Sequence, residues 1–204
     1  MLRNRISGRG RTKLKRNIKD VLAEKLEPEQ VNRLYKTYDI VGDVAVIRVP
    51  EEFEQFSQEV AEAIMSIHRE VKSVWMQSSS VSGDYRLRDL KHVLGKKTTE
   101  TIYREYGCIY KTDLRQAYFS PRLSFERMRI AKLVQKQETI LNMFAGVGCY
   151  SIAIAKHAEP LKVISIDINP FAFKYLEENI RLNRAEKTVV AFQGDAKTVT
   201  ETKF

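Results

Sequence analysis

The chain has 204 residues, of which 43% are apolar and 30% are charged, enough to bury the core of one large domain or two small ones. No apolar run approaches the roughly 18 residues of a membrane-spanning helix, and no signal-peptide core follows the N-terminus, so we expect a cytosolic protein. A formal charge of +9, from 35 Lys and Arg against 26 Asp and Glu, favours a polyanionic partner. The two cysteines, Cys108 and Cys149, form no metal-binding pattern, and we expect buried thiols and no metal site.

The positive charge is concentrated at the start of the chain. We interpret residues 1–12 as a basic arm, which Gly8 and Gly10 loosen. Such an arm is typical of a segment that contacts phosphates, although a solvated tail that keeps the protein soluble has the same composition. The residues expected to make these contacts are Arg3, Arg5, Arg9, Arg11 and Lys13.

Residues 13–112 have the mixed pattern of an α+β domain. Apolar residues at helical spacing begin at Ile18, and a second short helix is expected from Pro28 to Leu34. Two strands, 38–41 and 44–49, flank Gly42 and Asp43, which resemble a hairpin turn. Residues 51–70 place apolar side chains on one stripe of a helix, and a further strand is expected at 71–76.

The segment 77–111 has less regular periodicity. Tyr85, Arg86 and Arg88 alternate aromatic and basic groups, as a nucleic-acid surface does, but a charged edge hairpin has the same pattern. A strand ending at 103–107 and a partner at 108–111 are expected. The domain boundary falls near Thr112 and Asp113 without a proline- or glycine-rich linker, so we expect the domains to pack closely.

A helix is predicted after residue 120, because Ser120 is a good N-cap and Pro121 a good first helical residue. It should run to about Gln135 with an apolar stripe of Leu123, Ile130, Leu133 and Val134. Glu126 lies within that stripe, where desolvation would raise its pKa and suit a general base. Spacing alone leaves open the alternative, an ion pair of Glu126 with a neighbouring arginine.

Residues 138–158 predict a strand, a tight turn containing Gly146 and Gly148, and a helix. A second strand ends at Asp167, about 20 residues beyond the glycines, where an acid can accept hydrogen bonds from ribose hydroxyls. The pattern indicates a cofactor that carries a nucleoside. The third glycine of a dinucleotide fingerprint is missing, so NAD and FAD are disfavoured relative to S-adenosylmethionine, whose loop has an aromatic residue, here Phe144, before Gly-x-Gly.

Three blocks in this order resemble the archaeal and eukaryotic tRNA (guanine-37-N1) methyltransferases. They are Tyr118-Phe119-Ser120-Pro121-Arg122-Leu123 with Glu126-Arg127, Asn142-Met143-Phe144-Ala145-Gly146-Val147-Gly148, and Asp167-Ile168-Asn169-Pro170. Wyosine-pathway enzymes that transfer an aminocarboxypropyl group are also similar, but Pro121-Arg122-Leu123 favours methyl transfer. The resemblance implies an α/β fold in which residues 113–204 form the N-terminal part of a class I, Rossmann-like methyltransferase domain.

The resemblance also implies a role for each site residue. Glu126 matches the base that removes the guanine N1 proton, Arg86 the cation that stabilises charge on O6, and Tyr118 a tyrosine of the same pocket. Phe144, Gly146 and Gly148 match the cofactor loop, Asp167 the acid on the ribose, and Asp195 the acid on the adenine amino group. Arg88 and Arg122 are expected to contact RNA.

The partner that the resemblance implies is tRNA, contacted at its anticodon stem-loop by a monomeric enzyme.

The resemblance also implies a methyltransferase domain of about seven strands, with an Asn-x-Pro loop after the fourth strand. This sequence ends at Phe204, after the third predicted strand of that domain. We therefore expect a domain truncated after its third strand, either a fragment or an inactive form. Two alternatives to a tRNA (guanine-37-N1) methyltransferase stay open: a wyosine-pathway enzyme acting on a modified guanosine, and a non-catalytic basic RNA-binding module.

Overall fold

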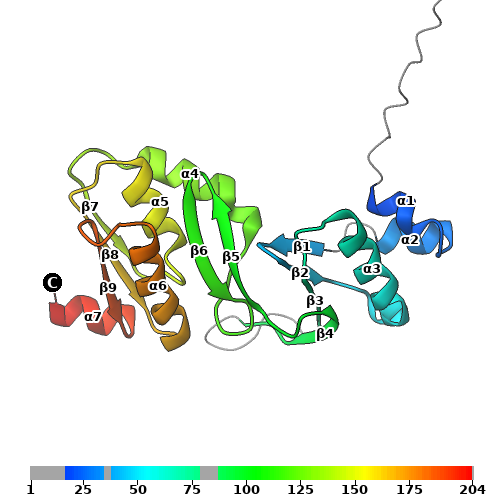
Figure 1. Ribbon diagram of the computed structural model, residues 1–204. Coiled ribbons are helices and arrows are strands. Elements are labelled where there is room, and N and C mark those ends of the chain that lie inside the picture. The colour runs from blue at the N-terminus through cyan, green and yellow to red at the C-terminus, as the bar shows by residue number, and fades with distance from the viewer. Residues whose placement is uncertain (1–16, 35–37, 79–86, 204) are drawn as a thin grey trace, which may run out of the picture.

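The structure, a computed structural model, describes residues 17–34, 38–78 and 87–203. Figure 1 shows two layered α/β bodies with a two-stranded hairpin standing between their sheets. The mixed α/β architecture agrees with the fold class expected from the sequence. The arm 1–12, Lys13 and Arg86 lie outside the described residues.

The N-terminal body is a four-stranded sheet with helices on one side. Helices α1 (Ile18–Leu22) and α2 (Pro28–Leu34) precede strands β1 (Tyr38–Val41) and β2 (Val44–Ile47). Strands β3 (Ser73–Gln77) and β4 (Leu90–Gly95) complete the order β1-β2-β3-β4, in which β2 and β3 are parallel and the other pairs antiparallel. The predicted hairpin turn is confirmed: Val41 pairs with Val44 across Gly42 and Asp43.

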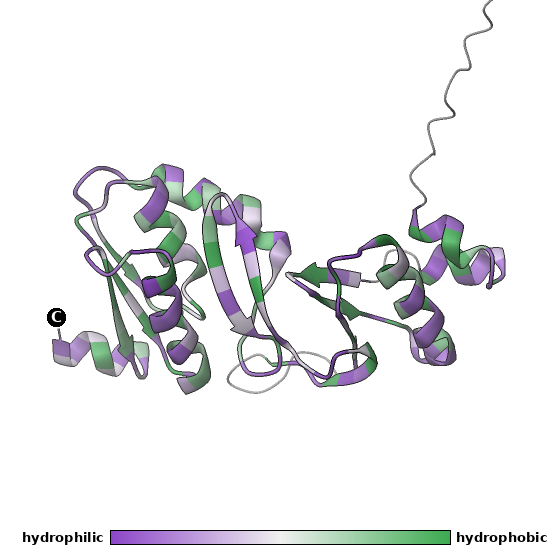
Figure 2. Cartoon of the chain, in the orientation of Figure 1, coloured by the Kyte–Doolittle hydropathy of each residue, from purple (hydrophilic) through white to green (hydrophobic). Residues whose placement is uncertain are grey.

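The predicted amphipathic helix after Pro50 is present but changes type along its length. It starts as the 3-10 helix η1 (Glu51–Phe56) and continues as α3 (Ser57–Ile67). Val60 and Ile64 are fully buried and pack on the sheet, as their spacing predicts. Figure 2 shows the hydrophobic residues gathered on the strands that such helices cover.

Strands β5 (Glu100–Glu105) and β6 (Cys108–Asp113) form the hairpin between the two bodies. Its turn residues, Tyr106 and Gly107, have φ of 44° and 73°, the left-handed values that a type I′ turn requires at both positions. The turn predicted between 103–107 and 108–111 is confirmed.

The C-terminal body is a parallel sheet of three strands covered by helices. Strands β7 (Thr139–Asn142), β8 (Lys162–Asp167) and β9 (Val189–Gln193) lie in that order. Helices α5 (Cys149–His157), α6 (Pro170–Leu182) and α7 (Ala196–Lys203) each follow one strand. The predicted strand–turn–helix at 138–158 is confirmed.

The helix predicted after Ser120 differs from the expectation in two ways. It begins as the 3-10 turn η2 (Pro121–Leu123), continues as α4 (Ser124–Leu133), and receives no side-chain cap from Ser120. The predicted apolar stripe is only half confirmed: Ile130 and Val134 pack against the core, but Leu123 is 36% and Leu133 62% exposed. The buried residues of α4 are Arg127 and Ala131.

A buried ion pair accounts for the burial of Arg127, which the sequence analysis did not expect. Arg127 is 2% exposed and its side chain donates to both oxygens of Glu105 on β5, with Nε to Oε1 at 2.5 Å and Nη2 to Oε2 at 2.8 Å. Its Nη1 donates to the Ser120 carbonyl at 3.1 Å, and its guanidinium lies 5.6 Å from the centre of the Phe119 ring. Arg127 therefore joins α4 to the hairpin and to the segment before η2.

The two bodies contact each other closely, as the absence of a linker predicts. Val41 of β1 belongs to the same buried cluster as Tyr110 of the hairpin and Ile152 of α5. The Thr101 hydroxyl of β5 donates to Asp43 at 2.7 Å, which fixes the hairpin to the turn between β1 and β2. Among the described residues, no helix is long and apolar enough to cross a bilayer.

We predict that Arg127→Met strongly destabilises the fold, since it leaves the Glu105 carboxylate buried without its cation. Removing one partner of a buried pair costs about 3–5 kcal/mol. The free energy of unfolding, measured by urea denaturation, should fall by that order. The matched control is Glu62→Gln, which breaks the exposed pair with Lys25 and should leave the urea midpoint almost unchanged. Equal effects of the two variants would contradict the assignment.

Candidate functional site

The loop between β7 and α5 takes its shape from two glycines. Gly146 and Gly148 have φ of 55° and 92°, in the left-handed region that glycine adopts at little cost. The Ala145 amide donates to the Ile166 carbonyl at 2.8 Å, so the loop continues the sheet toward β8. The glycines are thus needed for the turn itself.

The two glycines differ in their surroundings. A Cβ on Gly146 would meet nothing within 4 Å, so the backbone there faces open space. A Cβ on Gly148 would lie 2.7 Å from Cδ1 of Leu176 and 3.2 Å from Cδ1 of Ile152. Gly146 therefore leaves room for a ligand, whereas Gly148 permits close packing of α5 against α6.

Asp167, at the end of β8, is held beside this loop. One carboxylate oxygen accepts from the Gly146 amide at 2.5 Å, and the other accepts from the Asn169 amide at 2.9 Å. Asn169 is 4% exposed and caps α6, and its Nδ2 donates to the Gln116 carbonyl at 2.7 Å. These bonds orient the carboxylate at the edge of the sheet, where ligands of parallel α/β folds bind.

A cavity of about 490 Å³ lies at this edge. It contains four of the residues expected at the cofactor, Phe144, Gly146, Asp167 and Asp195, but Gly148 is not among its lining residues. A volume of this size suits a cofactor with a nucleoside and a side chain. The lining residues are Tyr118, Met143, Phe144, Gly146, Asp167, Ile168, Asn169, Ala172, Gly194, Asp195 and Ala196.

Asp195 lines the same cavity just before the start of α7. Its Oδ1 accepts from the Thr198 amide at 2.9 Å and from the Thr198 hydroxyl at 3.2 Å. The bond from the Thr198 amide is the largest cause that lowers the pKa of Asp195. The carboxylate is therefore ionised at neutral pH and available as a hydrogen-bond acceptor.

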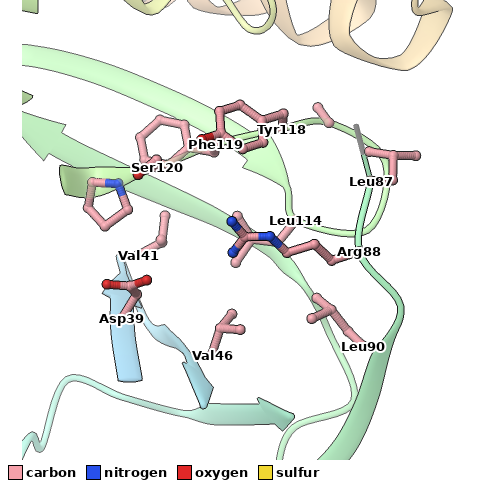
Figure 3. Close-up of a pocket in the computed structure, with 12 residues that line it drawn as sticks. Asp39, Val41, Val46, Leu87, Arg88, Leu90, Leu114, Tyr118, Phe119 and Ser120 are labelled. Atoms are coloured by element: carbon pink, nitrogen blue, oxygen red, sulfur yellow. The ribbon is translucent and has the colours of Figure 1, made fainter. Parts of the chain in front are cut away.

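A second, smaller cavity of about 40 Å³ lies between the N-terminal sheet and the segment before η2. Figure 3 shows Arg88 extending into it, with Asp39 and Tyr118 on its sides. The Arg88 guanidinium carbon lies 6.0 Å from the centre of the Tyr118 ring, and its buried Nε has no hydrogen-bond partner among the described residues. Tyr118, which is 42% exposed, lines both cavities.

Arg122 is bound by an acid from the other body. Its Nε donates to Asp39 of β1 at 2.6 Å, and Arg48 of the N-terminal body donates to the second oxygen of the same carboxylate. Asp39 is mostly buried, whereas the Arg122 side chain is 55% exposed. A phosphate that contacts Arg122 would have to compete with this carboxylate.

Glu126 lies outside both cavities. It is half-exposed on α4, and its two oxygens accept from Nε and Nη2 of Arg129, each at 2.7 Å. This pairing lowers the pKa of Glu126, although burial opposes the change. The raised pKa expected from a position in a buried stripe is therefore wrong, and the ion pair that spacing left open is present.

The two cysteines are shielded from reaction. Burial raises the pKa of Cys108 and raises that of Cys149 to about 12. Both are thiols at neutral pH, and the expected burial is met by Cys108, whereas Cys149 is only partly buried. Among the described residues, no three His, Cys, Asp or Glu side chains are grouped to hold a metal ion.

Sequence reasoning missed several lining residues of the larger cavity. Asn169 had a readable signal, since Asn before Pro170 is a typical N-cap. Met143, Ile168 and Gly194 neighbour residues that were expected there, but nothing in their own pattern marks them. Asn179, inside α6, and Asn183, the C-cap of that helix, were also missed, because polar residues on a helix are usually solvated.

We predict that Gly148→Ala destabilises the protein more than Gly146→Ala. Both alanines would take up a left-handed conformation, which costs about 1–2 kcal/mol. Only the Cβ at 148 also collides with Leu176 and Ile152, and such overpacking costs about 1–3 kcal/mol more. Urea denaturation of the two variants measures the difference, and equal midpoints would contradict the packing role of Gly148.

We also predict that Arg129→Met raises the pKa of Glu126 toward that of free glutamate. The pKa of Glu126 is depressed in the folded chain. The ion pair therefore stabilises the fold at pH values above the pKa of Glu126 in the unfolded chain, and this stabilisation is lost as the pH falls through the pKa of Glu126 in the folded chain. Carboxyl ¹³C NMR titration measures the change. Lys132→Met, on the same helix, is the control and should leave the Glu126 titration unchanged.

Comparison with known proteins places this site in a family. Residues 101–204 match the TRM5/TYW2 methyltransferase domain and residues 18–98 the TYW2 N-terminal domain. The tRNA (guanine(37)-N(1))-methyltransferase Trm5b of Pyrococcus abyssi is 46% identical over 84% of this chain and 52% of its own length. The tRNA 4-demethylwyosine(37)-methyltransferase Taw21 of Saccharolobus solfataricus is 40% identical over 86% of this chain and 66% of its own length.

A solved structure extends the likeness to the fold. The complex of aTrm5 and tRNALeu superimposes with a TM-score of 0.80 at 34% identity, over 89% of this chain and 54% of that one. The chain thus spans between half and two thirds of the length of these proteins. The match over residues 101–204 includes the hairpin, the glycine loop and both cavity acids. This chain belongs to the TRM5/TYW2 methyltransferase family.

Proposed function

We propose that this chain belongs to an S-adenosylmethionine-dependent methyltransferase that modifies N1 of guanosine 37 in tRNA. The observation that carries the proposal is the 490 Å³ cavity, which is lined by Asp167 and Asp195 and shares Tyr118 with a second cavity. The similarity to Trm5b supports the choice of reaction.

The cavity residues fit the cofactor. Asp167 accepts one backbone amide on each oxygen, and each oxygen retains a lone pair for a ribose hydroxyl. Asp195 would accept from the adenine amino group, and the open backbone at Gly146 leaves room beside the loop. When bound, S-adenosylmethionine supplies an electrophilic methyl group on a sulfonium.

Methyl transfer would form a bond from guanine N1 to the methyl carbon and break the bond from that carbon to the sulfonium sulfur, which would leave as the thioether of S-adenosylhomocysteine, while N1 loses its proton. We propose that Glu126 takes this proton after the substrate displaces it from Arg129. Freed from its cation, the carboxylate becomes a stronger base, since the ion pair is the cause of its lowered pKa. Arg86 would stabilise the negative charge that develops on O6, and Tyr118, shared by the two cavities, would line the pocket of the base.

The rest of the substrate would be tRNA, contacted at the anticodon stem-loop by a monomeric, cytoplasmic enzyme. We propose that Arg88 and Arg122, where the two bodies meet, contact phosphates of the tRNA. Further phosphate contacts would come from the basic arm and the residue after it, namely Arg3, Arg5, Arg9, Arg11 and Lys13. We retain the three segments 1–12, 13–112 and 113–204 as a working division of these roles. The target guanine can leave the base stack of a single-stranded loop at a modest cost in free energy.

The proposal predicts transfer of labelled methyl to a tRNA transcript with guanosine 37 and none to its adenosine 37 counterpart, using the protein as its gene encodes it. Glu126→Gln should lower the single-turnover rate by about 10²- to 10⁴-fold, the usual contribution of a general base. Glu138→Gln, an exposed acid beyond the same helix, is the control and should keep the wild-type rate. Transfer of labelled methyl to both transcripts would contradict the proposal.

A second candidate is a wyosine-pathway activity, which the similarity to Taw21 favours. The same cavity serves it, because the cofactor is unchanged and only the modified guanosine or the transferred group differs. Mass spectrometry of the product nucleoside separates methyl from aminocarboxypropyl transfer. Salt-sensitive tRNA binding without cofactor binding would instead support a non-catalytic RNA-binding module.

A further inference from the structure

Strand β6 has one edge without a neighbouring strand in the described sheets, and α6 covers it. Two asparagines of that helix bind the edge. Oδ1 of Asn179 accepts from the Lys111 amide at 2.7 Å, while its Nδ2 donates to the Lys111 carbonyl at 2.9 Å. Asn183 makes the same pair of bonds to Ile109, at 2.8 Å and 2.6 Å. Each carboxamide therefore replaces the peptide group of a neighbouring strand.

The spacing of the two asparagines makes this substitution possible. Residues four apart on a helix are separated by about 6 Å along its axis. Residues two apart on a strand, such as Ile109 and Lys111, are separated by about 6.8 Å. Asn179 and Asn183 thus match the outward-facing residues of β6, with helix and strand running in opposite directions.

Only Asn179 makes a further bond into the cofactor loop. Its Nδ2 also donates to the Val147 carbonyl at 2.9 Å, whereas the additional bond of Asn183 returns to the Asn179 carbonyl of its own helix. Asn179 is fully buried, and Val147 is 1% exposed. Val147 lies between the two glycines, one residue from the amide that holds Asp167.

We propose that Asn179 is a positioning residue for the cofactor. By holding the Val147 carbonyl against the hairpin, it orients the peptide at Gly146 so that its amide meets the Asp167 carboxylate. Asn183 docks the hairpin by the same chemistry but has no part in the loop. This inference rests on the proposed use of the 490 Å³ cavity for S-adenosylmethionine.

The test compares two isosteric variants, Asn179→Asp and Asn183→Asp, in the protein as its gene encodes it. Each replaces a donor by a carboxylate oxygen that faces carbonyls, so both should lower the melting temperature. Only Asn179→Asp should also weaken binding of S-adenosylmethionine, by about tenfold or more in calorimetry, because it leaves the Val147 carbonyl unpaired. Equal affinities in the two variants would overturn the positioning role.

A second measurement does not depend on the cofactor. In ¹H–¹⁵N spectra without ligand, the Gly146 amide should shift in Asn179→Asp and stay in place in Asn183→Asp, since it reports on the bond to Asp167. If circular dichroism shows that Asn179→Asp is unfolded, Asn179→Ser and Asn183→Ser replace the pair with the same expectations. An unmoved Gly146 amide overturns the inference, whereas a wild-type protein that binds no S-adenosylmethionine overturns only the proposed function.

Discussion

The structure depends on how the hairpin of β5 and β6 is held between two sheets. In the described part of the chain, neither strand of the hairpin pairs with a strand of those sheets. A two-stranded hairpin is only marginally stable alone, and its open edge exposes peptide groups that require partners. The carboxamides of Asn179 and Asn183 are the partners of the β6 edge, and Arg127 holds the end of β5 through the Glu105 carboxylate. Because these bonds are buried, each is strong and each is costly to lose.

The hairpin in turn determines the relative positions of the catalytic candidates. Arg127 ties α4, and hence its neighbour Glu126, to β5, while Asn179 ties the glycine loop to β6. The segment carrying Tyr118 is fixed through the Ser120 carbonyl by the same arginine. The 490 Å³ cavity and α4, which carries the proposed base Glu126, are therefore both held by the hairpin, although their residues are far apart in the chain.

Sequence patterns predicted the elements that local chemistry determines. The glycine loop, Asp167 at the strand end and the α3 stripe were all read correctly, because turn geometry and apolar periodicity are local signals. The environment of Glu126 was not, since the buried face of α4 depends on Glu105, which lies 22 residues from Arg127 and on a different element. The docking role of Asn179 was also unreadable, because a helix residue that pairs with a distant strand has no periodic signature.

Three arginines, Arg48, Arg122 and Arg129, are paired with carboxylates within the chain, which bears on how a polyanion would bind. Asp39 binds Arg48 and Arg122, and Glu126 binds Arg129. A phosphate that takes one of these cations must first break an ion pair, so the net gain per contact is smaller than for a solvated arginine. The consequence would depend on which ion pair is broken. A ligand that separates Glu126 from Arg129 would raise the basicity of Glu126, whereas a phosphate that binds Arg122 would weaken its contact with Asp39 of the N-terminal body. Under the proposed function, the ion pairs that stabilise the free chain would therefore link RNA binding to the basicity of Glu126.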